Sequence, residues 1–309
     1  MSNQLSQLVQ TKIVPGLYKQ YFAGSKTAWM ENNAIGVEYT GGKYVVMHEM
    51  DVDGLGNYDR QLGYPSGNIS GSKQQFEMKM DRGREFLIDA ADNDETGFLL
   101  SVANAMSIFQ QKWVIPEVDC YRYSKIYKEV STKASANILA EDIPAATITD
   151  QLADDITQIR DIYGDMPLAI TMSGLTQKYF GREFDRGLDY MNFIVGELHT
   201  KVKGLDGNPF MITPSARLKT SYDFLDGVTE SQRAGGFKAS AGAKDIAWMI
   251  TPLNGPIAVA KIDKMRAFSP DEYQKADAWK CDYRLYHDLW MTQEACNSSL
   301  IRTGAITKA

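Results

Sequence analysis

The residues with the most suggestive spacing for chemistry lie in an acidic, glycine-rich stretch. Asp51, Asp53 and Gly56 match the opening of a calcium-binding loop, in which oxygen ligands occupy positions one and three and glycine occupies position six. The match then fails, because position five is Leu55 and position twelve is Leu62, where a bidentate glutamate is required. We therefore expect no metal site in this stretch.

The other candidate groups are isolated from one another. Gly54 and Gly56 lack the third glycine of a dinucleotide-binding turn, and no serine lies in a Gly-x-Ser-x-Gly turn. Asp154 and Asp155 are expected on the exposed side of a helix. The histidines and cysteines have no partner at metal-ligand spacing, and packing is the expected role of the cysteines; these residues are His48, His199, His287, Cys120, Cys281 and Cys296. The sequence predicts no catalytic residue, no cofactor and no metal.

Composition narrows the class of protein further. A chain of 309 residues with 44% apolar residues can form a substantial core. A net charge of −6 argues against a dedicated nucleic-acid binder. The sequence shows no signal-peptide pattern and no apolar run long enough to span a membrane, so we expect no membrane association. The odd number of cysteines indicates a reducing compartment.

Two helices are predicted from apolar residues at helical spacing. The first covers residues 98–115, with a capping arrangement over residues 92–95 before it and Pro116 bending or ending it. The second covers residues 148–163, with Thr147 as its cap and Gly164 at its end. Its apolar stripe consists of Leu152, Ile156 and Ile159.

Two strands, residues 37–50 and 73–89, flank the glycine-rich stretch 51–72 and predict a long hairpin. A strand of fourteen residues reaches about 45 Å, far beyond the roughly 19 Å radius of gyration of a compact chain of this length. A two-stranded ribbon is marginal without a second layer, so we expect an identical neighbouring subunit to cover it. The predicted assembly interface consists of Tyr44, Val46, His48, Phe76, Met78, Met80 and Trp29.

The remaining segments have mixed patterns. Residues 1–34 read as an arm, interrupted at Pro15 and Gly16. Residues 166–173 read as a buried strand, two further strands join at residues 206–207, and residues 226–245 form a loop rich in small residues. Three more strands are predicted over residues 246–251, 257–268 and 283–291.

Three segments, in order, carry a resemblance to a known family. They are FEMKMDRGREFLIDAADNDETGFLLSVANAMSIFQQKWVIPEVDCYRYSKI at 76–126, KGLDGNPFMITPSARLKTSYDF at 203–224, and IAVAKIDKMRAFSPDEYQKADAWKCDYRLYHDLWM at 257–291. Taken together, they resemble the major capsid proteins of tailed bacteriophages with the Hong Kong 97-type fold, an α+β fold. The specificity lies in the order and spacing of the segments, because no single one is a chemical signature.

This resemblance implies a domain organisation. It comprises an N-terminal arm (1–34), an extended E-loop hairpin (35–90), a P-domain with a spine helix (91–135 and 256–295) and an axial A-domain (136–255 and 296–309). Because the chain begins almost at the arm, a scaffolding protein is expected to be separate. Covalent cross-linking between subunits is not expected, because the residues that form it in some relatives find no match here.

The same resemblance implies a function. Pentamers and hexamers of the chain would tile an icosahedral phage head around double-stranded DNA, touching it without base specificity. Partners would be neighbouring capsid subunits and separate scaffolding, portal and decoration proteins. The location would be the virion, after assembly in the host cytoplasm. Two alternatives stay open: an encapsulin-like nanocompartment with protein cargo, and a small-molecule-binding enzyme whose hairpin acts as a lid.

Overall fold

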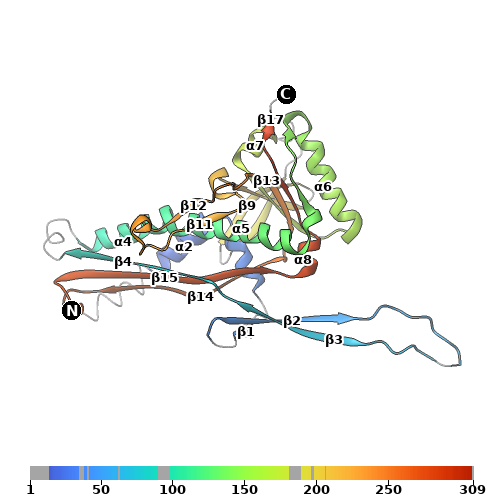
Figure 1. Cartoon of the computed structure of the whole chain (residues 1–309), viewed down its shortest axis with the longest axis horizontal. Coiled ribbons are helices and arrows are strands. Elements are labelled where there is room, and N and C mark those ends of the chain that lie inside the picture. The colour runs from blue at the N-terminus through green and yellow to red at the C-terminus, as the bar shows by residue number, and fades with distance from the viewer. Residues whose placement is uncertain are drawn as a thin grey trace.

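The computed structural model describes residues 14–34, 38–39, 42–61, 63–89, 98–180, 189–195, 198–205 and 207–307. The predicted cap over residues 92–95 and the first part of the predicted arm lie outside these ranges. Figure 1 shows a triangular body of helices and strands standing on a long, flat sheet, with one hairpin projecting sideways from the end of that sheet.

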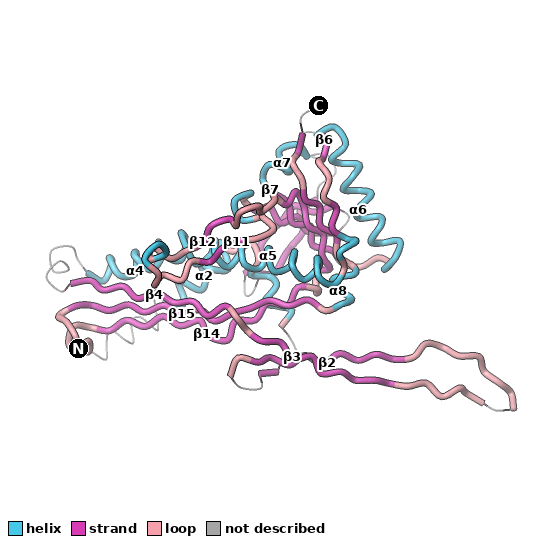
Figure 2. The backbone as a smooth tube through the Cα atoms, viewed as in Figure 1, coloured by secondary structure: helices cyan, strands magenta, loops and turns pink. Residues whose placement is uncertain are grey.

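A seven-stranded mixed sheet forms the centre of the body (Figure 2). Its strands, in spatial order, are β5 (Ile138–Leu139), β16 (Leu300–Thr303), β13 (Ile246–Pro252), β7 (Leu168–Ser173), β10 (Asn208–Thr213), β9 (Leu198–Leu205) and β8 (Asp189–Val195). The buried strand predicted at 166–173 is confirmed as β7, and β13 confirms the strand predicted at 246–251. The two strands predicted around residue 206 are three, since β8, β9 and β10 follow one another as antiparallel neighbours.

Helices cover both faces of this sheet, which explains why its central strands are apolar on both sides. On β7, Leu168 and Ile170 pack beneath α6 (Ile148–Tyr163) and α7 (Gly174–Phe180), while Ala169 faces α5 (Ile115–Lys133) and α8 (Gln293–Asn297). The bounds of α6 confirm the second predicted helix. Its stripe of Leu152, Ile156 and Ile159 is buried as predicted, although the Thr147 side chain makes no capping hydrogen bond.

The first predicted helix continues past Pro116, so this proline does not end it. It consists of α4 (Phe98–Phe109), a π-helical turn, η3 (Gln110–Val114), and α5. Pro116 falls in the first turn of α5, directly after the wider π turn, which is a known way to fit a proline that cannot donate a backbone hydrogen bond. The segment from Phe98 to Lys133 is about 54 Å long.

The long flat sheet has three antiparallel strands in the order β14 (Pro256–Phe268), β15 (Ala278–Met291) and β4 (Met80–Asp89). The strand predicted at 257–268 is confirmed as β14, and β15 begins five residues before the predicted 283. One face of the sheet packs against α4, the start of α5, and α2 (Val14–Gly24). Pro15 and Gly16 lie in the first turn of α2, where proline's missing N–H costs no hydrogen bond.

The described part of the predicted arm is integrated into the body instead of extending freely. After α2, the short helix η2 (Ala28–Asn33) buries Ala28, Trp29 and Met30. Asn33 donates two side-chain hydrogen bonds, to the carbonyl oxygens of Leu253 and Pro256. Residues 14–33 are therefore part of the folded core of the subunit.

Minor elements complete the chain. β11 (Tyr222–Phe224) lies just before the predicted 226–245 loop and β12 (Phe237–Ala239) lies within it, and these two strands form a small sheet. β17 (Ile306–Thr307) pairs with β6 (Ile143–Pro144). Four single-turn helices are η4 (Ser135–Asn137), η5 (Ala145–Thr147), η6 (Ser215–Arg217) and η7 (Glu230–Gln232).

The projecting hairpin contains β2 (Tyr44–Val52) and β3 (Ile69–Glu77), with β1 (Glu38–Tyr39) beside β2. The predicted second strand, 73–89, is in fact two strands: β3 pairs with β2, and β4 then leaves the hairpin to pair with β15. The change of sheet occurs at Met78 and Lys79. The hairpin is consequently shorter than predicted but carries a long tip, residues 53–68.

Candidate assembly surface

The hairpin tip is ordered by its own backbone and by two aspartates. Asp53 and Asn68 close it: the Asp53 N–H donates to the Asn68 carbonyl at 3.1 Å, and the Asn68 N–H donates to the Asp53 carboxylate at 2.7 Å. Further out, Asp59 and Gly63 exchange backbone hydrogen bonds of 2.8 and 3.1 Å. Gly63 adopts a φ of +84°, which favours glycine. The carboxylates of Asp53 and Asp59 thus accept backbone hydrogen bonds that order the loop.

Apolar side chains along the outer hairpin have no cover within the subunit. Leu55 is fully exposed and Tyr64 is 88% exposed. The Tyr58 and Tyr64 rings contact each other with centroids 5.0 Å apart. Further exposed apolar residues are Met50, Val52 and Ile69. Exposure of several large apolar side chains along one hairpin is typical of an interaction surface.

The base of the hairpin, in contrast, is part of the core. Val45, Met78, Ile257 and Trp290 form one buried cluster between the hairpin and the flat sheet. Phe76 packs on Trp290 with ring centroids 5.4 Å apart. The base therefore fixes the direction in which the hairpin projects.

The seven residues predicted for the assembly interface differ in how far they are buried within the subunit. Tyr44 is exposed, Phe76 and Met80 are partly buried, and Val46 and Met78 are buried within the subunit. The His48 side chain lies outside what the structure describes. Trp29 is separate from the hairpin residues, because it lies in the main core with its ring edge against Phe193. The predicted interface leaves out the most exposed residues of the tip, although their place in a glycine-rich segment is a signal for exposure.

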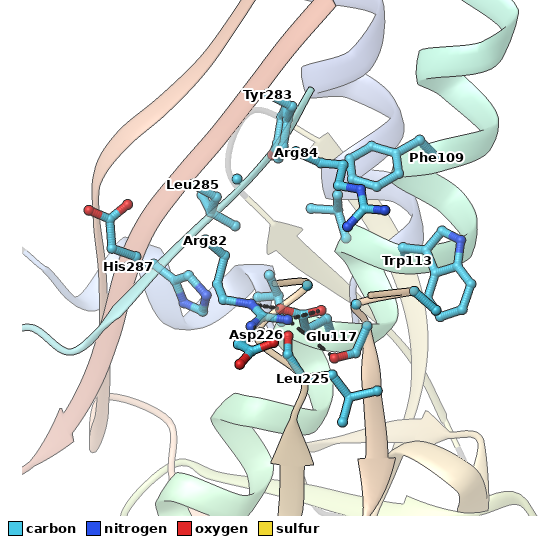
Figure 3. Close-up of a pocket in the computed structure, with 18 of the residues that line it drawn as sticks. Arg82, Arg84, Phe109, Trp113, Glu117, Leu225, Asp226, Tyr283, Leu285 and His287 are labelled. Carbon is cyan, nitrogen blue, oxygen red and sulfur yellow. Dashed lines mark hydrogen bonds and ion pairs between the residues drawn. The ribbon is translucent and has the colours of Figure 1, made fainter. Parts of the chain in front are cut away.

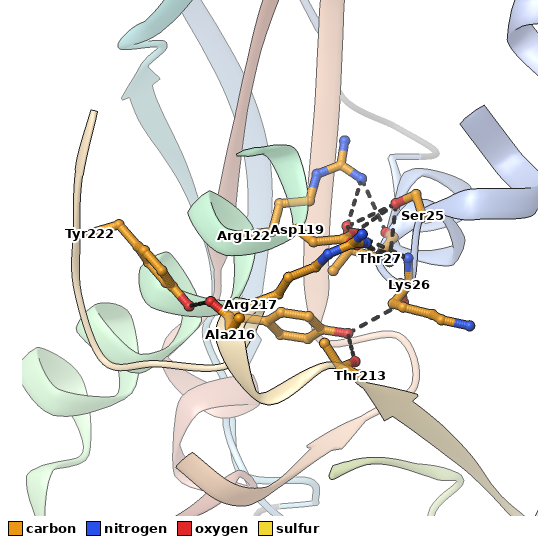
Figure 4. A network of polar contacts seen from close by, with 10 residues as sticks. Ser25, Lys26, Thr27, Asp119, Arg122, Thr213, Ala216, Arg217 and Tyr222 are labelled. Atoms are coloured by element: carbon orange, nitrogen blue, oxygen red, sulfur yellow. Dashed lines mark hydrogen bonds and ion pairs between the residues drawn. The ribbon is translucent and has the colours of Figure 1, made fainter. Parts of the chain in front are cut away.

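Within the body, a buried carboxylate attaches the N-terminal segment to α5 (Figure 4). Asp119 accepts hydrogen bonds from the Ser25 hydroxyl at 2.8 Å, from the Lys26 backbone N–H and from both the backbone and the hydroxyl of Thr27. Arg217 adds an ion pair at 3.2 Å. A fully buried carboxylate with this many donors is satisfied in place, so it works as a structural clamp.

A second buried ion pair corrects the prediction for Asp155. Asp155 lies in the core and accepts hydrogen bonds from Arg302 at 2.6 and 3.0 Å and from the Trp248 indole N–H at 2.8 Å. Only Asp154 is exposed as predicted. The signal for burial was present, because Asp155 falls three residues after Leu152 and beside Ile156 on the apolar stripe. This pair connects α6 to β13 and β16.

A pocket of about 260 Å³ lies where β4, the α4–α5 helix and the β11–β12 segment meet (Figure 3). Arg82 crosses it and donates to the Glu117 carboxylate at 2.7 Å and to the carbonyl oxygens of Leu225 and Gly236. Arg84, two residues along the same strand, donates to the carbonyl of Arg233. The alternation of Arg82 and Arg84 in the DRGR segment places both on one face of β4.

One histidine and three cysteines of the body are held in unreactive states. Burial, with nearby arginine charges, lowers the pKa of His287 at the pocket to about 3, so this imidazole is neutral at ordinary pH. Burial raises the pKa of Cys120 to about 12 and those of Cys281 and Cys296 to about 11, so the thiols stay protonated. No three metal-ligating side chains come together among the described residues. Within those residues, no helix has the length and apolar character needed to cross a bilayer.

Comparison with known proteins identifies the fold. No family model matches the sequence, and no curated protein matches it either. Solved structures do match. The mature capsid of bacteriophage PhiM1 has 10% identity, with 85% of this chain and 82% of that chain covered at a TM-score of 0.56. The capsid of cyanophage P-SCSP1u has 10% identity, with 87% and 85% covered at 0.53. The capsid of a native GTA particle has 9% identity, with 90% of both chains covered at 0.54.

At these identities, what the chains share is the fold. This chain therefore has the mixed α and β fold of phage capsid proteins, which confirms the fold family predicted from the resemblance. The assignment of its individual domains stays a prediction.

Proposed function

We propose that this chain is a major capsid protein whose copies assemble into the pentamers and hexamers of an icosahedral phage head. The observation that carries the proposal is the joint presence of a capsid fold over most of the chain and a hairpin whose outer apolar side chains have no cover in the subunit. A soluble monomer has no reason to present such a surface, whereas a shell subunit uses it on a neighbour.

The domain assignment follows the contacts of the fold. We assign the E-loop to the hairpin within residues 35–90, and the P-domain to the long helix with the β14–β15–β4 sheet, within 91–135 and 256–295. The A-domain is assigned to the seven-stranded sheet with its helices, within 136–255 and 296–309. The clusters support this division, since the sheet strands and α6 share one core while the flat sheet and α4 share another.

Assembly in this proposal uses many modest contacts. Each subunit offers a hairpin to one neighbour and receives another, so that closure of the ring multiplies weak contacts into a stable particle. The buried base holds the hairpin in position before a neighbour arrives, which lowers the entropy lost on association.

The interior of the proposed shell holds double-stranded DNA without base-specific contact. A net charge of −6 is compatible with enclosure of DNA, because an acidic subunit does not bind tightly to the phosphate backbone. Scaffolding, portal and decoration proteins would be separate partners, and the protein would reside in the virion after assembly in the host cytoplasm. The encapsulin-like alternative is not favoured, because the similar structures reported above are capsids of phages and of a GTA particle.

Expression of the protein followed by negative-stain electron microscopy tests this proposal. We expect closed shells or capsomer rings, and particles from host cells should protect double-stranded DNA from nuclease. A protein that stays monomeric under all conditions, with the hydrodynamic radius of a compact chain, contradicts the proposal. Shells filled with protein cargo would instead identify a nanocompartment.

A further inference from the structure

The pocket between β4, the α4–α5 helix and the β11–β12 segment has no role in the proposed function. Its volume of about 260 Å³ has room for an aromatic ring with a short side chain, since a cavity of roughly 150 Å³ accommodates benzene. Figure 3 shows Arg84, Phe109 and Trp113 on one side of the pocket and Arg82 and His287 on the other. These two sides offer different interactions to a ligand.

The first side offers an aromatic surface. The rings of Phe86 and Phe109 lie edge to face with centroids 4.9 Å apart, and Phe109 contacts Tyr283 in the same way at 5.9 Å. Trp113 lines the same pocket and is 38% exposed, so part of its indole is accessible to a ligand. Aromatic molecules pack favourably against such rings, either edge to face or stacked with an offset.

Glycines of the 225–236 segment form another wall of the pocket. A Cβ atom on Gly236 would lie 2.6 Å from the Trp113 ring, so the indole can lie against this backbone only because the residue is glycine. A Cβ atom on Gly227 would lie 3.0 Å from Nη1 of Arg84. Both glycines have positive φ angles, of 80° and 72°. The shape of the pocket is therefore fixed by its backbone.

The two arginines of the pocket differ in whether their charge is matched. Arg82 forms an ion pair with Glu117 at 2.7 Å. Among the described residues, no carboxylate forms an ion pair with Arg84, whose guanidinium donates to a backbone carbonyl. Of the other carboxylates of the lining, Asp81 forms an ion pair with an arginine of β15, and Asp226 accepts hydrogen bonds from its own loop. Arg84 is therefore the cation that can best hold an anionic group of a ligand.

The other side of the pocket holds a buried group without a partner. His287 is 1% exposed, and its Nδ1 atom has no hydrogen-bond partner within the described part of the chain. Its imidazole is neutral at ordinary pH, so one ring nitrogen can accept a hydrogen bond. A buried polar atom without a partner is unfavourable, and a hydroxyl group of a ligand supplies the missing donor.

We propose that this pocket binds a small hydroxyaromatic acid, with its carboxylate at Arg84, its ring against the aromatic side chains and its hydroxyl group at His287. A ligand bound in this way contacts β4, the α4–α5 helix and the β11–β12 segment together. It stabilises the subunit by mass action, because the site exists only in the folded chain. The inference goes beyond the proposed function, since it concerns a ligand of the single subunit.

Ligand-observed NMR titrations of the purified protein with three probes test this site. The probes are para-hydroxyphenylpropionate, phenylpropionate, which lacks the hydroxyl group, and tyramine, which has an ammonium group in place of the carboxylate. We expect hydroxyphenylpropionate to bind with a Kd of about 1 mM, which is reasonable for a ligand of this size. Phenylpropionate should bind about five-fold more weakly, because it leaves His287 without a donor. Tyramine should bind at least about ten-fold more weakly, because its charge repels Arg84.

Two variants assign the contacts to their residues. Arg84→Met should weaken the binding of hydroxyphenylpropionate at least about ten-fold and abolish its advantage over tyramine. His287→Met should remove the advantage of hydroxyphenylpropionate over phenylpropionate, while the binding of phenylpropionate itself stays the same. The matched control is Arg266→Met, which removes an exposed arginine on β14 outside the pocket and should change none of the affinities. Circular dichroism checks that each variant is folded.

Three outcomes overturn the site. They are equal affinity of the wild-type protein for all three probes, an affinity for hydroxyphenylpropionate that Arg84→Met leaves unchanged, and no binding of this probe up to about 10 mM. Because the titrations need no assembly, their failure leaves the capsid function standing. Protein that binds the probe but forms no particles overturns the proposed function and leaves the ligand site standing.

Discussion

The seven-stranded sheet and the projecting hairpin are both built from β-strands, yet they differ in where their apolar side chains find partners. On β7 and β13 every residue is buried, because helices cover both faces of the sheet. On the outer part of β2 and β3, residues such as Met50 and Ile69 are exposed. The seven-stranded sheet is therefore stabilised by contacts within the subunit, whereas the outer hairpin can still bury its apolar side chains against another molecule.

The buried ion pair of the sheet region gives the largest expected effect on the free energy of unfolding. Asp155→Ala leaves Arg302 as an uncompensated buried charge and should destabilise the subunit by about 3–5 kcal/mol, measured by urea denaturation. The control is Asp155→Leu with Arg302→Met, which removes both charges and should cost less than the single change. Equal losses from both variants would show that charge burial is not the cause.

Arg82 tests the contact of the flat sheet with α5 and the β11–β12 segment. Arg82→Met removes the ion pair with Glu117 and the hydrogen bonds to Leu225 and Gly236, and should cost about 2 kcal/mol in urea denaturation. Arg84→Met is the matched control, since Arg84 is exposed and contacts only one described carbonyl, and it should change stability by less than about 0.5 kcal/mol. A larger loss for Arg84→Met would reverse this ranking.

Acid sensitivity should come partly from His287. Its pKa is lowered from 6.5 to about 3 in the folded subunit, so below pH 6.5 the unfolded chain binds a proton that the folded chain does not. Its contribution is fully present above pH 6.5 and is lost as the pH falls towards 3, at up to about 1.4 kcal/mol per pH unit. His287→Met should flatten the pH dependence of the unfolding free energy over this range. An unchanged profile would show that other groups control it.

The hairpin tip should give the smallest effect on subunit stability and a complete effect on assembly. Residues 53–68 can be replaced by Asn-Gly, because Val52 and Ile69 are directly opposed and a two-residue turn connects such a pair. We expect the unfolding free energy to change by less than about 0.5 kcal/mol, while electron microscopy shows no closed particles. Normal particles from this variant would show that the tip is dispensable.

Local patterns in the sequence predicted several elements with their bounds. Helix α6 and strands β7, β13 and β14 follow from spacing and composition within one segment, and the hairpin follows from two strands around a glycine-rich run. Fold membership was predicted from the order of three longer segments.

Features that depend on distant contacts were missed. The burial of Asp155 depends on Arg302, a residue 147 positions away. The helix passes Pro116 directly after a π turn, and proline alone does not reveal that turn. The separation of β4 from the hairpin depends on β15, whose pairing partner no local pattern identifies.

The change of sheet at Met78 and Lys79 has a mechanical consequence. The hairpin meets the body at a small base, where the Lys79 N–H donates to Asp288 and the Tyr286 hydroxyl donates to the carbonyl of Met78. From Tyr44 to the end of the tip the hairpin is a lever of roughly 53 Å, so turning its base by about 10° moves the tip by about 9 Å. Because the packed base sets this angle, a small repacking of the base is enough for one subunit to meet the different curvatures of the proposed pentamers and hexamers.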